Sequence, residues 1–211
     1  MLAFSESQAL RVPPGHRWLV RRQAALFFPL LAFEGFHLRQ QSFRIVLGAR
    51  GRYPRAEALA MAAHFAGYFG ALLWCFGPGG GLFFVVVHHV AMGFYLGLVF
   101  APNHVGMPIL EDDVALDFVR AQVVTTRNVR PGPIVDFFFG GLNYQIEHHL
   151  FPRMPRTHLP AARRLVRRFC RERWIPYRET GVLGAYVEVL RGLHRAGAPL
   201  RLPAGDRSAP A

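Results

Sequence analysis

Two long apolar segments dominate the pattern of hydrophobic and polar positions along the chain. Residues 56–76 (AEALAMAAHFAGYFGALLWCF) and 82–101 (LFFVVVHHVAMGFYLGLVFA) are nearly free of charge. Each is about 20 residues long, which is enough for a helix to cross a hydrocarbon layer of roughly 30 Å. The glycine-rich segment 77–81 (GPGGG) between them is typical of a turn. The pattern therefore predicts a transmembrane helical hairpin; the alternative is a buried hairpin in the core of a soluble protein.

The arginines around this hairpin predict its orientation. Arg50, Arg52 and Arg55 directly precede the first segment, whereas the turn at 77–81 carries no charge. Because positively charged residues tend to stay on the cytoplasmic side, both outer ends of the hairpin are expected in the cytoplasm. We therefore expect an integral protein of the plasma membrane whose residues after about 102 face the cytoplasm.

A shorter amphipathic segment precedes the hairpin. Residues 24–47 are apolar but contain a proline and several charged residues, so they make a poor spanning segment. Because their polar side chains gather mostly on one helical face, we expect a helix lying in the membrane interface. A helix packed on protein explains the same pattern.

Two further helices are expected after the hairpin. Residues 111–124 begin with acidic side chains, which favour a helix N-terminus, and continue with apolar residues at helical spacing. Residues 157–173 (THLPAARRLVRRFCRER) have Thr157 as their candidate N-cap. Their apolar and arginine-rich faces predict a basic helix against the bilayer, and a solvated basic face is the alternative. The apolar face consists of Ala162, Leu165, Val166 and Phe169.

The composition favours a membrane protein over a soluble one. Of the 211 residues, 52% are hydrophobic and 19 are Phe, which is heavy for a soluble domain. The net charge of +12 suits nucleic acid or an anionic lipid surface. The arginines flank apolar spans and no nucleic-acid-binding motif is present, so we expect membrane lipid, and no nucleic acid, as a partner. The small, proline-rich residues 196–211 are expected to be disordered.

A histidine cluster carries the candidate chemistry. In the segment NYQIEHHLFP, Gln145, His148 and His149 would share one face of a short helix, because residues three and four apart are neighbours on a helix. The final proline disfavours continuing that helix past Phe151. Imidazole suits iron, zinc and copper, and ligating histidines need partners that orient their rings. The candidates for that supporting role are Asn143, Glu147 and Asp136.

A second cluster lies at the predicted cytoplasmic end of the hairpin. The segment FAPNHVGMP places Asn103 and His104 just past the second span. They are on the same predicted side of the membrane as His148 and His149, so imidazoles from distant parts of the chain can meet there. His88, inside the second span, lies about 24 Å from His104 along the same helix and is left out of the site with its neighbouring histidine.

The segment QIEHHLFPRMPR, preceded by DFFFGGLNY and FAPNHVGMP, resembles a known family. It is similar to the C-terminal part of the membrane fatty acid desaturases, specifically the acyl-lipid or front-end branch, and the resemblance covers roughly residues 1–195. It implies an all-α integral membrane fold: a transmembrane hairpin, interfacial helices and a cytoplasmic helical region, 102–195, that carries a histidine box. It also implies a di-iron centre that uses O2, a fatty acyl substrate, and a separate electron donor such as a ferredoxin or a cytochrome-b-type protein.

The resemblance implies a role for individual residues. By position, His148 and His149 match the iron ligands of the family's third histidine box, and Gln145 replaces the first histidine of that box. His104 matches a further iron ligand after the last span. Asn103 precedes it in the same pattern and can reach the metal through water. No catalytic residue beyond the metal ligands is implied.

The chain departs from the family pattern before the hairpin. The family's first and second histidine boxes, with HxxxH-like and HxxHH patterns, do not occur in residues 1–102. We therefore expect residues 1–211 to form a partial desaturase domain, from a truncated reading frame, a misassigned start, or a split or decaying gene. Because three histidines cannot hold two irons, we expect it to be inactive alone. The alternatives are a non-catalytic membrane remnant or partner subunit, and a related histidine-box lipid hydroxylase.

Overall fold

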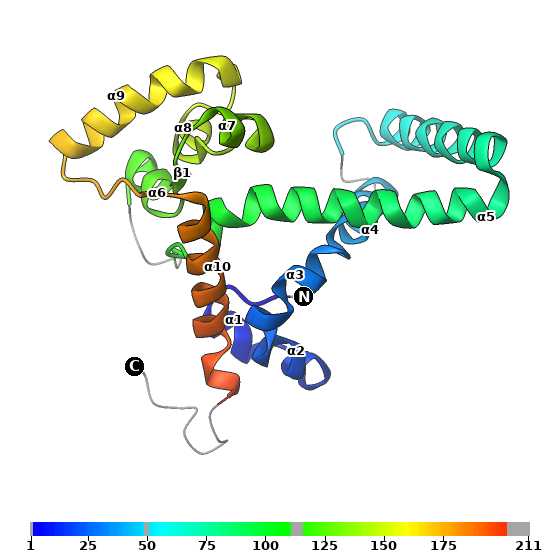
Figure 1. Ribbon diagram of the computed structural model, residues 1–211, viewed down its shortest axis with the longest axis horizontal. Helices are drawn as coiled ribbons and strands as arrows, with labels where there is room; N and C mark the ends of the chain where they lie inside the picture. The colour runs from blue at the N-terminus through cyan, green and yellow to red at the C-terminus, as the bar shows by residue number, and fades with distance from the viewer. Residues whose placement is uncertain (1, 49–50, 111–115, 202–211) are drawn as a thin grey trace. The chain divides into compact units, whose positions relative to one another are not determined.

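The computed structural model describes residues 2–48, 51–110 and 116–201. Within them the chain is mostly helical, as expected (Figure 1). The all-α expectation needs one addition, because two short strands, β1 (Asn128–Val129) and β2 (Glu179–Thr180), pair in parallel.

The helices divide between two compact units. Unit 2 is Phe28–Gly97, and unit 1 is the described part of 1–27 and 98–211. Unit 1 contains α1 (Glu6–Leu10), η1 (Pro14–His16), α2 (Arg17–Arg21), α6 (Phe118–Val124), α7 (Pro133–Phe139), α8 (Gln145–Leu150), η2 (Arg156–His158), α9 (Leu159–Glu172), α10 (Val182–Ala196) and η3 (Ala198–Leu200). Unit 2 contains α4 (Glu34–Leu47), while α3 (Gln23–Leu31) and α5 (Pro54–His104) each run from one unit into the other.

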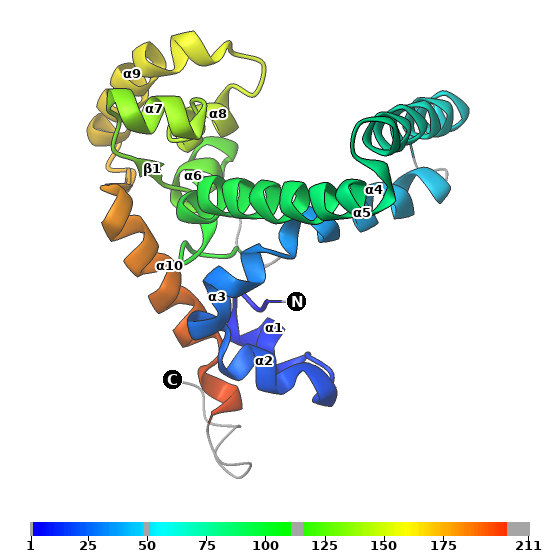
Figure 2. The same ribbon diagram turned by 45° about the vertical axis from the view of Figure 1, so that its right-hand side comes forward.

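Helix α5 reverses direction at a single glycine (Figures 1 and 2). Gly77 has φ 65° and ψ −178°, a conformation that glycine adopts without the steric cost of a Cβ. It divides α5 into two arms, 54–76 and 78–104. The arms contact each other, since the Tyr68 hydroxyl lies 2.8 Å from His88 Nδ1. The reversal therefore takes one residue, and the rest of the GPGGG segment, expected as a turn, is already helical.

Helix α5 also carries the apolar stretch that could meet a membrane. Within the described ranges it is the one helix long and apolar enough to cross a bilayer, with a mean hydropathy of 2.0 in its most apolar window. Only 17% of that window is buried inside the protein. Because a helix in a soluble core buries its apolar side chains, this exposure disfavours the soluble-core alternative.

The segment expected as one interfacial helix, 24–47, is two helices instead. Helix α3 ends two residues after Pro29, and α4 begins after a short turn. Proline has no N–H to bond the preceding turn, and its ring clashes with the carbonyl four residues earlier. The next hydrogen bonds span three residues and not four: the Ala32 N–H donates to the Pro29 carbonyl at 3.3 Å, and the Phe33 N–H donates to the Leu30 carbonyl at 3.0 Å. The continuous helix expected from periodicity is therefore broken at Ala32 and Phe33.

The end of α3 and the start of α4 pack closely on the second arm of α5. A Cβ added at Gly93 would lie 2.3 Å from the Leu31 carbonyl oxygen, and one at Gly35 would lie 2.3 Å from that of His89. The Phe36 ring stacks on the His89 imidazole, with ring centroids 4.8 Å apart. This crossing packs the start of α4 on α5, and the position of the segment in a membrane interface stays a prediction.

Gly93→Ala is expected to lower the thermal stability of the detergent-solubilised protein, because the new methyl group would collide with the Leu31 carbonyl. Overpacking of this kind costs about 1–3 kcal/mol. Gly70→Ala is the matched control, since a Cβ there meets nothing within 4 Å and alanine favours a helix by about 1 kcal/mol over glycine. Scanning fluorimetry compares the melting temperatures; an undiminished value for Gly93→Ala would contradict the close crossing.

The apolar clusters of unit 1 join segments that are distant in sequence. Val20 and Leu200 belong to one cluster, and Val123, Ile146 and Cys170 belong to another. Helix α10 and η3 therefore pack beside α1 and α2 (Figure 1). This differs from the disordered tail expected at 196–211: Ala196 and Leu200 are buried, and residues 202–211 lie outside the described residues.

Two helix starts in unit 1 differ from the expected ones. Helix α6 begins at Phe118 because the Asp117 carboxylate caps it, accepting from Arg120 N–H at 2.9 Å; 111–115 of the expected 111–124 helix lie outside the described residues. Thr157 does not cap α9 but lies in the preceding 3-10 turn, η2. A capping Thr157 would accept from the N–H of the second or third helical residue, and the third, Pro160, has no N–H.

Candidate functional site

Helix α8 carries His148 and His149 and is positioned by Asn128 on β1. The Asn128 Oδ1 accepts a hydrogen bond from the Ile146 N–H at 2.9 Å. This bond satisfies one of the free donors in the first turn of the helix. Helix α8 ends at Leu150, as the following proline predicts, so the expected short helix is confirmed.

Glu147 is fully buried and faces Asn128 and Tyr177. Its carboxylate accepts from the Asn128 Nδ2 at 2.7 Å and from the Tyr177 hydroxyl at 2.9 Å. Burial raises the pKa of the Glu147 carboxyl, and these two hydrogen bonds oppose the shift. Glu147 therefore ties α8 to β1 and Tyr177. The sequence had made it a candidate for orienting a histidine ring.

Asn143 and Asp136, the other two expected supporting residues, pair with each other. The Asn143 Nδ2 donates to the Asp136 carboxylate at 2.7 Å, and the Tyr144 hydroxyl donates to it at 3.1 Å. Burial, followed by the Asp136 charge, raises the pKa of Tyr144 to about 12, so its hydroxyl stays protonated. These contacts brace the turn between α7 and α8, where Gly140 and Gly141 have φ values of 58° and 91°.

His149 is oriented by Gln122 on α6, a residue that the sequence did not single out. The His149 Nδ1 lies 2.9 Å from the Gln122 Oε1. Because an amide oxygen only accepts, this bond places the ring proton on Nδ1 and leaves the Nε2 lone pair free. Burial, and then the neighbouring His148, lowers the pKa of His149, which favours the neutral imidazole that metals bind.

The structure brings His104 and His149 together. Their ring centroids are 5.2 Å apart, although 45 residues separate them in sequence. The centroid of the His148 ring is 6.1 Å from that of His149, and the two ring planes make an angle of 68°. Among the residues that the structure describes, no three His, Cys, Asp or Glu side chains are grouped so that they could hold a metal ion. Two of the three predicted ligands thus meet, and His148 does not complete a group with them.

Asn103, which directly precedes His104, meets Gln145, which lies on the same helix as His149. Both side chains are buried, and the Asn103 Nδ2 donates to the Val99 carbonyl at 3.0 Å and reaches the Gln145 Oε1 at 3.5 Å. The Asn103 Oδ1 is buried without a hydrogen-bond partner. An unsatisfied buried oxygen is uncommon and calls for an unseen water or ion.

These groups fit one side of an iron site. Iron accepts neutral imidazole nitrogens, which His104 and His149 supply on rings whose centroids are 5.2 Å apart, and oxygen donors complete such sites. The free Asn103 Oδ1 is consistent with a water-mediated contact to a metal. The set remains too small for two irons, because the grouped imidazoles number two.

A cavity of about 400 Å³ opens beside the two histidines. His104 and His149 contribute to its wall, and the other lining groups are largely apolar, including Met107, Ile109 and Leu110. An apolar space that ends at two imidazoles can admit a hydrocarbon segment and exclude water around the reacting group.

The buried side chain of Arg127 closes the C-terminal end of α5. Its guanidinium donates to the carbonyl oxygens of Pro102 and Val105 and forms an ion pair with Glu188 on α10. Its backbone N–H donates to the Asn103 carbonyl at 3.0 Å. Carbonyls at a helix C-terminus lack partners and carry partial negative charge, so a cation is favourable there. Nothing in the sequence distinguishes Arg127 from the many other arginines.

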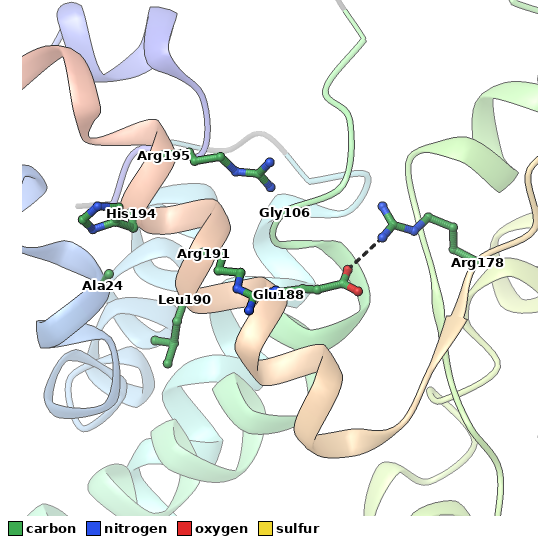
Figure 3. A pocket seen from close by; sticks show the side chains of 8 residues that line it. All are labelled: Ala24, Gly106, Arg178, Glu188, Leu190, Arg191, His194 and Arg195. Atoms are coloured by element: carbon green, nitrogen blue, oxygen red, sulfur yellow. Dashed lines mark hydrogen bonds and ion pairs between the residues drawn. The ribbon is translucent and has the colours of Figure 1, made fainter.

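A second cavity, of about 680 Å³, lies beside α10 (Figure 3). Gly106 lines both this cavity and the histidine cavity. At its edge Arg178 donates to the Glu188 carboxylate at 3.2 Å, while the same carboxylate holds Arg127. Glu188 therefore links an exposed basic surface to the buried end of α5. The other basic side chains of this surface are Arg191, His194 and Arg195.

Arg127→Ala is expected to destabilise the protein by about 3–5 kcal/mol, because it removes one partner of a buried ion pair and leaves the carbonyls of α5 unsatisfied. Arg120→Ala is the matched control: its pair with Asp117 is about half exposed on both sides, and such pairs contribute at most about 1 kcal/mol. Urea unfolding in detergent, followed by circular dichroism, measures both. Equal losses would show that Arg127 does not hold the end of α5.

Comparisons with known proteins point to one family. A family model described as "Fatty acid desaturase" matches residues 5–181. The Delta(5) fatty acid desaturase fat-4 of Caenorhabditis elegans is 37% identical over 57% of this chain and 28% of its own length. Fatty acid desaturase 3 of Homo sapiens is 31% identical over 86% of this chain and 40% of its own. The Delta(8)-fatty-acid desaturase of Euglena gracilis is 33% identical over 84% and 45%. The chain thus spans less than half the length of these relatives, and no solved structure matches it.

Proposed function

Since the chain belongs to the fatty acid desaturase family, we propose that it forms part of an iron site that introduces a double bond into a fatty acyl chain. The observation that carries this proposal is the approach of His104 and His149, with ring centroids 5.2 Å apart, beside an apolar cavity. The relatives named for Delta(5) and Delta(8) desaturation support an acyl chain as substrate.

The proposed placement in the membrane follows from α5. Both arms cross the bilayer, and Gly77 lies at the far side. Arg52 precedes the first arm and Arg55 lies in its first turn, while Arg50 lies outside the described residues. The positive charge keeps both outer ends of α5 on the cytoplasmic side of the plasma membrane. His104 then lies at the cytoplasmic surface, where a separate electron donor, such as a ferredoxin or a cytochrome-b-type protein, reaches the site.

The proposed reaction removes two hydrogens from neighbouring carbons of the acyl chain. Iron, when bound, would supply the activation of O2. Overall, O2 takes two hydrogens from the acyl chain, two electrons from the donor and two protons from water, and is reduced to two molecules of water. The chain's own residues bind and orient: His104 and His149 supply nitrogen, Gln122 holds the His149 tautomer, and Asn103 offers an oxygen. The apolar cavity receives hydrocarbon and excludes water. Gln145 stays bound to Asn103 and keeps it in place.

A non-catalytic membrane subunit is the second candidate. It is favoured by one observation, that His148 does not form a metal-holding group with the other two histidines among the described residues. In this reading the histidine pair holds at most one metal ion, and the contribution of the chain is structural.

Metal titration of the purified chain in lipid nanodiscs tests the histidine pair. Adding Co²⁺ as a spectroscopic substitute for iron is expected to produce one weak site, because two imidazoles bind a divalent ion without enclosing it. His104→Ala and His149→Ala should each weaken binding at least tenfold, whereas His158→Ala, at an exposed position on η2, should leave it unchanged. Equal binding in all three variants would reject the site.

The 211-residue chain alone is expected to show no desaturation, because His104, His148 and His149 are too few to ligate two irons. Iron quantification is combined with product analysis by mass spectrometry, with an acyl-lipid, O2 and a reduced donor supplied. Two irons per chain together with turnover would contradict the expectation and would also remove the non-catalytic candidate.

A further inference from the structure

Trp174 follows Arg173, the C-cap residue of α9, and has an unusual backbone conformation. Its φ is +56°, the only positive value among the described non-glycine residues, and its side chain is 93% exposed. Glycine is usual at this position after a helix, because a Cβ is strained there. A tryptophan here costs backbone free energy and gains nothing from burial in this protein. A large exposed aromatic held at such a cost suggests a contact outside the chain.

Helix α9 presents two more apolar side chains on its outer face. Leu165 is 61% exposed and Phe169, one helical turn later, is 42% exposed. The adjacent stripe of the helix packs on the rest of unit 1 through Leu159, Ala162, Val166 and Cys170. This corrects the sequence-based face, which grouped Ala162 and Val166 with Leu165 and Phe169: the first two pack on protein, and only the second two remain free for a partner.

The charges around these side chains are almost all positive. Arg163 is committed to the fold, because its guanidinium makes two bonds to Glu179 at 2.6 and 2.8 Å. Arg173 lies over the Phe169 ring, 5.5 Å from its centroid. Glu172 is the single exposed carboxylate of the helix, and it lies 3.8 Å from one arginine. The exposed arginines are Arg164, Arg167, Arg168, Arg171 and Arg173.

We propose that these residues form a lipid-docking patch for an anionic bilayer. The patch consists of Leu165, Phe169 and Trp174 with Arg168 and Arg173 beside them, while the other exposed arginines extend around the rest of the helix. Its apolar side chains enter the interfacial layer, where tryptophan is favoured, and the arginines meet lipid phosphates.

Two features commit the patch to lipid rather than to an acidic protein. The three apolar side chains stand out from a helix and its end and are not recessed in a pocket, so they suit a fluid layer that needs no matching shape. In addition, α5, which is proposed to cross the bilayer, continues into unit 1 at Leu98, so unit 1 is covalently tied to a membrane-crossing helix. The proposal therefore rests on the membrane placement of α5 given above.

The test uses the full chain with Trp18→Phe and Trp74→Phe, which leaves Trp174 as the single tryptophan. Both replaced side chains are mostly exposed, at 58% and 90%. The protein is placed in nanodiscs of phosphatidylcholine with or without phosphatidylglycerol, and brominated lipids serve as quenchers. Trp174 emission is expected to shift to shorter wavelength and to be quenched at least twofold more in the anionic discs, with the difference lost at high salt. Absence of quenching in both disc types overturns the proposal, as does equal quenching in the two.

A second variant separates docking from a structural role. Trp174→Gly is expected to leave the melting temperature unchanged or raise it, because glycine relieves the positive φ. In anionic discs, Trp174→Gly is also expected to raise the rate of trypsin cleavage at the arginines of α9 several-fold over that of the unsubstituted chain. In detergent the two chains should be cleaved at the same rate. A lower melting temperature would show that Trp174 supports the fold and would overturn the proposal.

The outcomes distinguish this inference from the proposed function. If the chain is removed from membranes by alkaline extraction, the placement of α5 fails first. If it stays inserted while Trp174 remains in water, only the lipid-docking patch fails. A shift of Trp174 emission on adding an acidic protein, without lipid quenching, would assign the patch to protein docking and overturn the lipid proposal.

Discussion

A single buried guanidinium supports the end of the helix on which the candidate site depends. Arg127 bonds the carbonyls of Pro102 and Val105 and is neutralised by Glu188. A buried charge is tolerable only when it is paired and its donors are used, and here the donors are used on the C-terminal turn of α5. That turn carries His104. The position of one metal-ligand candidate is thus set by a loop residue and by α10, both distant in sequence.

A second buried group holds the other candidate. Glu147 is surrounded by the donors of Asn128 and Tyr177, and Asn128 also caps the first turn of α8. Because β1 pairs with β2, this network joins α8 to the segment that leads into α10. Both sides of the histidine pair therefore depend on polar groups with no part in ligation. Membership of the desaturase family accounts for the histidines, and these contacts account for their approach.

Sequence proximity was a poor guide to the partners of the histidines. Glu147 adjoins His148, but consecutive residues point about 100° apart on a helix, so its carboxylate faces β1. The residue that orients His149 is Gln122, on a helix that the chain leaves 21 residues before α8 begins. Its spacing marks it as one more polar residue on an amphipathic helix. No local signal separates a glutamine that will meet an imidazole from one that will meet water.

The sequence by itself determined the elements with a strong local cause. The length of the apolar segments located α5, the glycines located its reversal, and a proline located the end of α8. Each of these signals acts over a few residues, through backbone geometry or through the transfer of apolar side chains out of water. The motif QIEHHLFPRMPR also sufficed to indicate the family. Only the tertiary structure decided that His104 meets His149 while His148 does not join them, and that half of the expected apolar face of α9 is buried. Those outcomes depend on contacts between segments far apart in the chain, where packing and the pairing of buried polar groups override local preference.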